Sequence, residues 1–173
     1  PYVIDSGGYL VGTDSLLKIN SGVVIKFSGL INGRIINQKL FEINGNDKNK
    51  IYFTSLKDDS IGGDTNGDSA STTPSQGDWY FIHNDKNATT TISNAVIRYG
   101  GAYHGNYGGY VGSVFNNKGT VSINNTEISS SLDRGINISS GTTTITNSII
   151  KDNTKYGIYQ NGGSATTTAS SIY

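Results

Sequence analysis

The sequence predicts an all-β fold, a β-solenoid of about seven coils with two loop excursions. Residues 1–173 form a single domain in this interpretation. The composition is the first supporting observation, because 23 Gly, 2 Pro and abundant Thr, Asn and Ser favour short strands and tight turns over helices. The other two observations are a motif that recurs about every 22 residues and columns of Ile and Val at matching intervals.

The recurring motif is a Thr- or Ser-rich strand that ends in asparagine. Its central isoleucines are separated by 31 and then by 22 residues: Ile92, Ile123 and Ile145. A further apolar residue follows each of them five positions later: Ile97, Ile128 and Ile150. A unit of this length cannot form its own core, so we expect each copy to be one coil, stacked about 4.8 Å from the next.

Two more columns accompany the motif. Val114, Ile136 and Ile158 are spaced by 22 residues, and Ile82 is the expected preceding member. These side chains should point inward and form the core. The asparagines that end the motif should stack at a turn as an asparagine ladder: Asn94, Asn125 and Asn147.

The N-terminal half shows a less regular version of the same pattern. Apolar strands are expected at residues 17–19, 23–27, 41–43 and 51–53, and Phe41 follows Leu17 by 24 residues, close to one coil. Two segments do not fit the repeat. Residues 58–78 contain only one apolar residue with strand character, and residues 100–110 supply the extra length of one coil, so both are predicted to be loops.

The charge and cysteine content exclude several classes of function. With 13 basic and 13 acidic residues the net charge is zero, which argues against nucleic-acid binding. The absence of Cys excludes disulfides and thiolate chemistry. No apolar run is long enough to insert in a membrane, and no signal peptide is present. The missing initiator Met suggests a mature form or a domain of a longer chain.

The first loop contains a candidate calcium site. Its acidic and amide residues are Asp58, Asp59, Asp64, Asn66, Asp68 and Asp78. Residues 64–68 match the first ligands of a calcium loop, although Ser69 and Ser75 replace the Gly and Glu of an EF-hand. We therefore expect Ca²⁺ to clamp the loop rather than to act as a sensor signal. The alternative is that these residues form ordinary Asx turns without a metal.

The second loop contains a candidate binding site for a ligand such as a sugar. Its aromatic residues alternate with glycine: Tyr99, Tyr103, His104, Tyr107 and Tyr110. Flat aromatic faces of this kind stack on sugar rings. The alternative is that the tyrosines pack over the side of the solenoid. Trp79 is expected to be structural.

Five segments resemble a known family. They are LLKINSGVVIKF at 16–27, IYFTSLKDDS at 51–60, GGDTNGD at 62–68, GDW at 77–79 and IRYGG at 97–101. Together they resemble the right-handed parallel β-helix repeat proteins, which are large secreted or cell-surface proteins of the pectate-lyase-like superfold. The resemblance covers essentially the whole chain. It implies a right-handed parallel β-helix and an extracellular location, but this fold hosts lyases, hydrolases, adhesins and scaffolds.

The favoured function is a non-catalytic, Ca²⁺-stabilised surface module for adhesion, polysaccharide contact or extracellular structure. The alternative is a polysaccharide lyase or glycoside hydrolase, which needs carboxylates on neighbouring coils. Only Glu127, Asp133 and Asp152 follow Asp85 along the chain, so the sequence offers few carboxylates for such a site. The Thr runs resemble the flat arrays of ice-binding solenoids, but Val121 interrupts the pattern, so the sequence favours strand formation alone.

The ends of a solenoid need a cap or a partner. Residues 1–11 could act as an N-terminal cap, whereas residues 166–173 begin another coil and stop. We expect either a longer natural chain or self-association through this open end, which would allow a head-to-tail filament.

Overall fold

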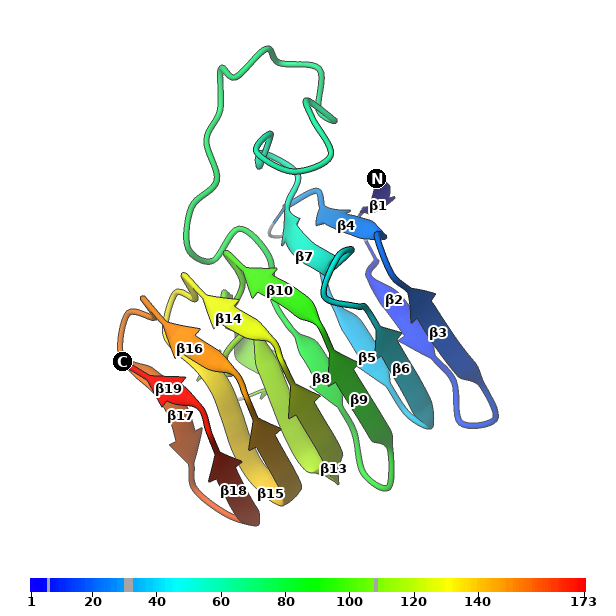
Figure 1. Cartoon of the computed structure of the whole chain (residues 1–173), viewed down its shortest axis with the longest axis vertical. Helices are drawn as coiled ribbons and strands as arrows, with labels where there is room; N and C mark the ends of the chain where they lie inside the picture. Colours follow the sequence, from blue (N-terminus) through cyan, green and yellow to red (C-terminus); the bar gives the residue numbers. More distant parts are fainter. Residues whose placement is uncertain (6, 30–32, 108) are drawn as a thin grey trace.

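A computed structural model describes residues 1–5, 7–29, 33–107 and 109–173 of the chain. The prediction of an all-β fold is confirmed. The described residues form two large sheets of seven and ten strands, in which all neighbouring strands are parallel, and one antiparallel pair (Figure 1). The helical content of this part of the chain is one 3₁₀ turn at Gly105–Tyr107. No helix among these residues is long and apolar enough to span a membrane.

The strand bounds follow the repeat. The seven-stranded sheet contains β1 (Tyr2–Ile4), β4 (Val24–Phe27), β7 (Ile51–Ser55), β10 (Ala95–Arg98), β14 (Glu127–Ser129), β16 (Ile149–Lys151) and β19 (Ser171–Ile172). The ten-stranded sheet contains β2 (Tyr9–Val11), β3 (Leu16–Asn20), β5 (Ile35–Asn37), β6 (Leu40–Asn44), β8 (Ile82–Asn84), β9 (Thr89–Ser93), β13 (Val114–Asn124), β15 (Arg134–Thr146), β17 (Tyr156–Gln160) and β18 (Ser164–Thr168). The antiparallel pair is β11 (Tyr103–His104) with β12 (Gly109–Tyr110).

The ten-stranded sheet consists of two ladders joined by the long strands β13 and β15. The first ladder contains β2, β5, β8, β17 and the N-terminal halves of β13 and β15. The second contains β3, β6, β9, β18 and the C-terminal halves of the same two strands. The seven-stranded sheet is the third ladder. After β1, the chain passes through the three ladders in this order six times: β2–β3–β4, β5–β6–β7, β8–β9–β10, β13–β14, β15–β16 and β17–β18–β19.

The strand register confirms the predicted columns. Ile92, Ile123 and Ile145 are aligned in the second ladder, and each is fully buried. In the first ladder, Val114 is aligned with Ile82 on one side and with Ile136 on the other, and Ile136 is aligned with Ile158. The third ladder aligns the other predicted series, Ile97, Ile128 and Ile150. These inward columns from the three ladders form one continuous hydrophobic core.

Asparagine side chains stack in two columns, and the sequence predicted one of these columns. In the external ladder, Asn94, Asn125 and Asn147 all have left-handed backbone angles, with φ of 52°, 46° and 49°. The Asn125 side chain donates to Asn94, whereas Asn147 donates to Asn124 instead. The second stack is a buried column of Asn37, Asn84 and Asn116, in which the Nδ2 of one residue donates to the Oδ1 of the next over 3.2 Å.

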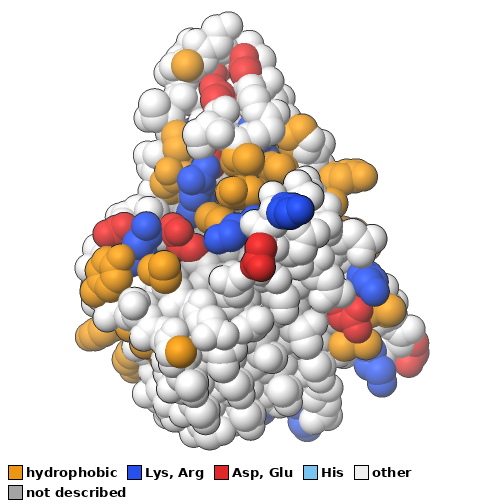
Figure 2. All heavy atoms as spheres, in the orientation of Figure 1, with side chains coloured by type: hydrophobic (Ala, Val, Ile, Leu, Met, Phe, Trp, Pro, Cys, Tyr) orange, Lys and Arg blue, Asp and Glu red, His pale blue; other side chains and the backbone are white. Residues whose placement is uncertain are grey.

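Both predicted loops interrupt the ladders where expected. Residues 56–81 link β7 to β8 and project from one end of the strands (Figure 1). Trp79 closes this loop against the core, since it is fully buried and stacks on Phe27 with 4.2 Å between ring centroids. Figure 2 shows charged and hydrophobic side chains gathered at the base of the projecting loop, while the surface over the opposite ends of the strands carries few of them.

The two ends of the ladders are open in the described residues. At the N-terminal end, β1 and β2 belong to the ladders, so most of the expected cap is itself part of the stack. This end carries a mainly apolar pocket of about 460 Å³, which Leu17, Ile19 and Ile35 help to line. At the C-terminal end, Tyr156, Ile172 and Tyr173 are exposed.

Candidate functional site

The aromatic loop folds into the β11–β12 hairpin, and two of its tyrosines face outward. Tyr103 and Tyr110 are paired across the hairpin, with 5.3 Å between their ring centroids. Their side chains are 59% and 36% exposed. Gly108, in the same loop, lies outside the described residues. The antiparallel pairing therefore holds two adjacent rings on the surface, as a stacking site for a sugar requires.

The other half of the loop packs against the first ladder. Tyr107 contacts Phe81 and His83 at 5.1 and 4.9 Å between centroids. His104 contacts the Tyr107 ring at 5.0 Å and lies 3.3 Å from Arg34 through Nε2. Burial lowers the pKa of the His104 imidazole, and the Arg34 charge acts in the same direction. One part of the loop, Tyr103 and Tyr110, thus faces solvent, whereas His104 and Tyr107 anchor the hairpin.

Tyr99 lies apart from both groups. It precedes Gly100 in a left-handed turn with φ of 66°, and the Arg98 guanidinium lies 5.4 Å from its ring centroid. Its carbonyl accepts a hydrogen bond from the backbone N–H of Asp78. Its backbone therefore joins the end of the acidic loop to the start of the aromatic one.

A second tyrosine pair, which the sequence analysis missed, lies two coils further along. Tyr156 and Tyr159 have ring centroids 5.6 Å apart, and the Arg134 guanidinium stacks 3.9 Å over the Tyr159 ring. Arg134 also donates to the carbonyl of Tyr110 over 2.7 Å. This arginine connects the second pair to the hairpin. We call this surface the tyrosine platform. It consists of Tyr103, Tyr110, Tyr156 and Tyr159 with the cations Arg134 and Lys155.

A buried carboxylate fixes the cations of the tyrosine platform. Asp133 is 1% exposed and pairs with Arg134 at 2.9 Å and with Lys155 at 2.7 Å. The hydrogen bond and charge of Asp133 raise the pKa of the Lys155 ammonium. The Lys155 Nζ lies 5.4 Å from the Tyr110 ring centroid. One negative and two positive groups leave the platform with a net charge of about +1 near neutral pH.

In the acidic loop, two of the six predicted ligands are engaged in ion pairs. Asp58 is 1% exposed and pairs with Arg98 at 2.6 Å. Burial alone would raise the pKa of Asp58, but hydrogen bonds from Thr54 and Ser60 and the charge of Arg98 lower it overall. Asp78 accepts from Ser55 and Lys57 and from the backbone of Ser75. These two carboxylates fasten the loop to the ladders, so the structure gives each of them a role that needs no metal.

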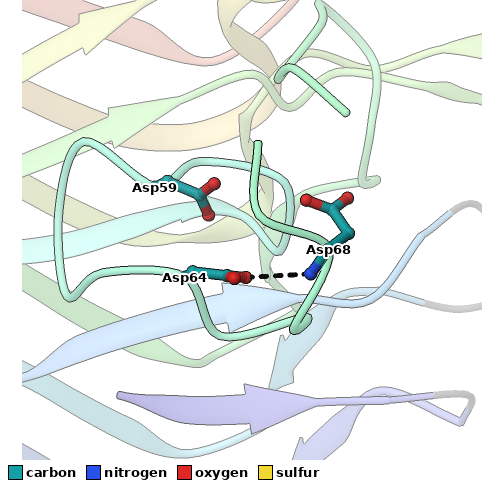
Figure 3. Close-up of side chains that lie close together, drawn as sticks. All are labelled: Asp59, Asp64 and Asp68. Atoms are coloured by element: carbon teal, nitrogen blue, oxygen red, sulfur yellow. Dashed lines mark hydrogen bonds between the residues drawn. The ribbon is translucent and has the colours of Figure 1, made fainter. Parts of the chain in front are cut away.

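The other four predicted ligands lie together. Asp59, Asp64 and Asp68 have carboxylate oxygens within 4.8 Å of one another (Figure 3). Asn66 lies beside them, because its Nδ2 donates to Asp68 over 2.8 Å. The Oδ1 of Asp59 and that of Asn66 are buried, and neither has a hydrogen-bond partner among the described residues. Two buried oxygens without donors, next to three carboxylates, match the donor set that Ca²⁺ prefers.

Asp64 organises the turn around this cluster. Its carboxylate accepts backbone N–H bonds from Ser69, Gly67 and Asp68 at 3.0, 2.7 and 3.2 Å. The bond from Ser69 is the main cause that lowers the pKa of Asp64. The ammonium of the buried Lys26, which donates to the carbonyl of Gly63, lowers it slightly further. Asp64 is thus ionised near neutral pH and holds the loop in the shape that brings the carboxylates together.

The structure also describes the carboxylates that the alternative function, polysaccharide cleavage, would need. Asp133 is held by its two cations, as described above. Glu127 pairs with Lys151 at 3.5 Å on the outer side of the third ladder. Asp152 lies in a left-handed turn with φ of 54° and is exposed. A general acid of a glycosidase must reach the sugar, whereas Asp133 is buried and paired with two cations.

Comparisons of the chain with protein-family models, with curated proteins and with solved structures give no match.

Proposed function

We propose that the chain is a right-handed parallel β-helix that serves as a non-catalytic module of a secreted or cell-surface protein and contacts polysaccharide. The proposal joins the stacked parallel ladders to the family resemblance of the sequence. One observation carries the functional part, namely the exposed tyrosine platform. Two tyrosine pairs, one on the β11–β12 hairpin and one on β17, are linked by Arg134 and Lys155.

The chemistry of the platform fits a sugar chain. Tyrosine rings offer flat apolar faces to the C–H faces of a pyranose and lose little conformational entropy on binding. Arg134 and Lys155 supply hydrogen-bond donors beside the rings, and Asp133 holds both cations before a ligand arrives. Such preorganisation lowers the entropic cost of binding. The second pair extends the site across neighbouring coils, as an extended polymer would require.

The geometry favours binding over catalysis. The one carboxylate of the platform, Asp133, is buried beneath its cations rather than exposed to a ligand. Lyase or hydrolase chemistry needs an accessible acid or base at the sugar. If the protein were found to cleave a polysaccharide, an enzymatic function would replace this proposal.

A glycan-array screen tests the binding function. We expect the wild-type protein to bind at least one polysaccharide class without releasing shorter products. Tyr103→Ala and Tyr156→Ala should each weaken that binding about tenfold, which corresponds to about 1.4 kcal/mol for one stacked ring. Tyr173→Ala is the matched control, because this tyrosine is 72% exposed but is not part of the tyrosine platform. Equal binding by all four proteins, or product release, would contradict the proposal.

We further propose that Ca²⁺ binds the acidic loop through Asp59, Asp64, Asn66 and Asp68. The proximity of the three carboxylates supports this, because they repel one another unless a cation lies between them. Lys26 compensates only part of this charge. The ion would hold residues 59–68 against the base of the loop, a structural role in line with the absence of flanking helices.

Thermal unfolding with Ca²⁺ and with EDTA tests the metal site. Free Ca²⁺ at about 100 times its Kd should stabilise the fold by about 2.7 kcal/mol. Asp59→Asn should abolish this gain, and in EDTA it should leave the Tm equal to or above that of the wild type because it removes repulsion. Asp14→Asn, at an exposed site outside the loop, is the control and should retain the full gain. An identical Tm of the wild type with Ca²⁺ and with EDTA would refute the site.

A further inference from the structure

The outer face of the second ladder carries a regular array of hydroxyl groups. On strands β9, β13, β15 and β18, residues on either side of the inward column point outward because side chains alternate along a strand. The register aligns them in three columns: Thr89, Thr120, Thr142 and Ser164, then Thr91, Ser122, Thr144 and Thr166, then Ser93, Asn124, Thr146 and Thr168. Eleven of these twelve side chains are hydroxyls, and the twelfth is an amide. We call this surface the hydroxyl face.

In the structure, Val121 does not interrupt the hydroxyl face, although it interrupts the Thr pattern in the sequence. Val121 is 1% exposed and points into the core, in the same inward column as Thr90 and Thr143. The valine therefore interrupts an internal column and leaves the outer columns complete. The middle residue of each Thr run is not equivalent to its neighbours, because alternation along the strand places it on the opposite side of the sheet.

The hydroxyl face is held in a repeating geometry. Residues 120–124 pair with 89–93 and with 142–146 without a bulge, and residues 142–146 pair in the same way with 164–168. Asn94, Asn125, Asn147 and Ala169 end the four strands with nearly the same left-handed φ of 46° to 52°. Outward side chains consequently repeat about 4.8 Å apart across the strands and about 6.6 Å apart along them.

The chemistry of the hydroxyl face differs from that of the rest of the surface. Its four strands contain no charged and no aromatic residue outside the segments of β13 and β15 that belong to the first ladder. Figure 2 shows the corresponding surface almost without charged or hydrophobic side chains. The same ladder is charged nearer the N-terminus, where Lys18 and Glu42 pair at 3.9 Å. Without aromatic rings, the hydroxyl face lacks the groups that stack on sugars, so a polysaccharide fits it poorly.

We propose that the hydroxyl face binds ice. A hydroxyl donates and accepts hydrogen bonds as water does, and the threonine methyl groups between them order the adjacent water. The array repeats at fixed intervals in two directions, as the oxygen lattice on a face of an ice crystal does. Cross-strand bonds from Thr146 to Asn124 and from Ser164 to Thr142 hold part of the array in place. This activity is separate from the tyrosine platform, which lies on β11, β12, β17 and the N-terminal end of β15, away from Thr142, Thr144 and Thr146.

Ice-growth assays test the proposal. We expect the full 173-residue chain to show thermal hysteresis, to shape single ice crystals and to inhibit recrystallisation. Serum albumin at the same mass concentration is the blank. Thr144→Lys, at the centre of the array, should lose most of the hysteresis, since a charged side chain projects into the bound lattice. Ser171→Lys introduces the same side chain at an exposed outward position of the third ladder and should retain the activity.

The outcomes separate the proposal from its competitors. Tm values must show that both lysine variants fold as the wild type does. If the wild type affects ice no more than albumin does, or if the two variants lose activity equally, ice binding by this face is wrong. Binding to microcrystalline cellulose or chitin that Thr144→Lys abolishes, with no effect on ice, would assign the face to a crystalline polysaccharide instead. Loss of glycan binding by the tyrosine variants leaves this result unaffected.

Discussion

At the scale of single residues, His83 is a buried imidazole whose pKa is lowered by its surroundings. It is 2% exposed and stacks on Phe115 with 4.8 Å between ring centroids. Neither ring nitrogen has a hydrogen-bond partner among the described residues. Burial lowers the pKa of His83 from 6.5 to about 4, with smaller opposing effects of Asp85, which raises it, and Arg34, which lowers it further. The imidazole therefore packs as an aromatic ring against Tyr107.

This burial predicts an acid-sensitive stability. The unfolded chain binds a proton at His83 near pH 6.5, whereas the folded chain resists it until about pH 4. The stability is thus complete above pH 6.5 and decreases as the pH falls to 4, by about 3 kcal/mol from this residue. His83→Phe should remove that part of the pH dependence at a cost of about 1 kcal/mol for the larger ring. Urea unfolding of both proteins at pH 8, 6 and 4.5 measures the difference, and parallel pH profiles would contradict it.

Residue types and their spacing predicted which residues form the candidate sites, but not which distant side chains these residues contact. The spacing of Asp64, Asn66 and Asp68 indicated the cluster that the structure shows. The engagement of Asp58 could not be foreseen, because Arg98 lies 40 residues further along the chain. Tyr156 and Tyr159 were missed for the same reason, since only the fold brings them near Tyr110. The signal available in the sequence was the Lys155-Tyr156 pair one coil after Asp133-Arg134.

At the scale of elements, the buried asparagine column does more for the fold than the external ladder. Asn84 donates to the carbonyls of Ala88 and Thr120 and to Asn116, and it accepts from Asn37 and Thr90. It thus satisfies backbone groups at the bend between the first and second ladders. In the external ladder, Asn125 makes two side-chain bonds near solvent. Buried networks lose more when one member is removed.

Paired substitutions compare the two stacks. Asn84→Ala should destabilise the protein by about 3 kcal/mol, because several buried groups lose their partners. Asn125→Gly keeps the left-handed backbone available and removes only the exposed side-chain bonds, so it should cost about 1 kcal/mol. Free energies of unfolding from urea titrations provide the measurement. A cost of Asn125→Gly equal to or above that of Asn84→Ala would show that the external ladder dominates.

The strands that follow the repeat and the positions of the two loops were predictable, whereas the structure within the loops was not. Equivalent isoleucines separated by one coil of 22 residues, such as Ile123 and Ile145, predict the strand, its inward face and its register together. The buried asparagine column could not be predicted from the sequence, because the loops between β5, β8 and β13 separate its members by unequal intervals of 47 and 32 residues. The hairpin at residues 103–110 depends on packing against Phe81 and Phe115, contacts that no local pattern encodes.

At the scale of the whole molecule, the fold is a linear stack in which each coil contacts its neighbours. Exposed strand edges and apolar side chains are present at both ends, including Leu10 and Leu16 at one and Tyr156 and Ile172 at the other. Such edges accept a further parallel strand, from a longer chain or from another subunit. The hydroxyl face lies on one side of the stack, whereas the tyrosine platform extends from the β11–β12 hairpin to β17 in the last coil.

Cysteine cross-linking tests the coil-by-coil stacking most directly, since the chain has no native Cys. Glu127 and Ile149 are aligned on adjacent strands of the third ladder, and Ser171 follows one strand later. Neighbouring strands are about 4.8 Å apart, within the span of a disulfide, whereas positions two strands apart are about 9.6 Å apart and beyond it. The stack predicts that Glu127→Cys with Ile149→Cys forms a disulfide without loss of the native Tm, and that Glu127→Cys with Ser171→Cys does not. Efficient cross-linking of the second pair but not the first would contradict the stacked arrangement.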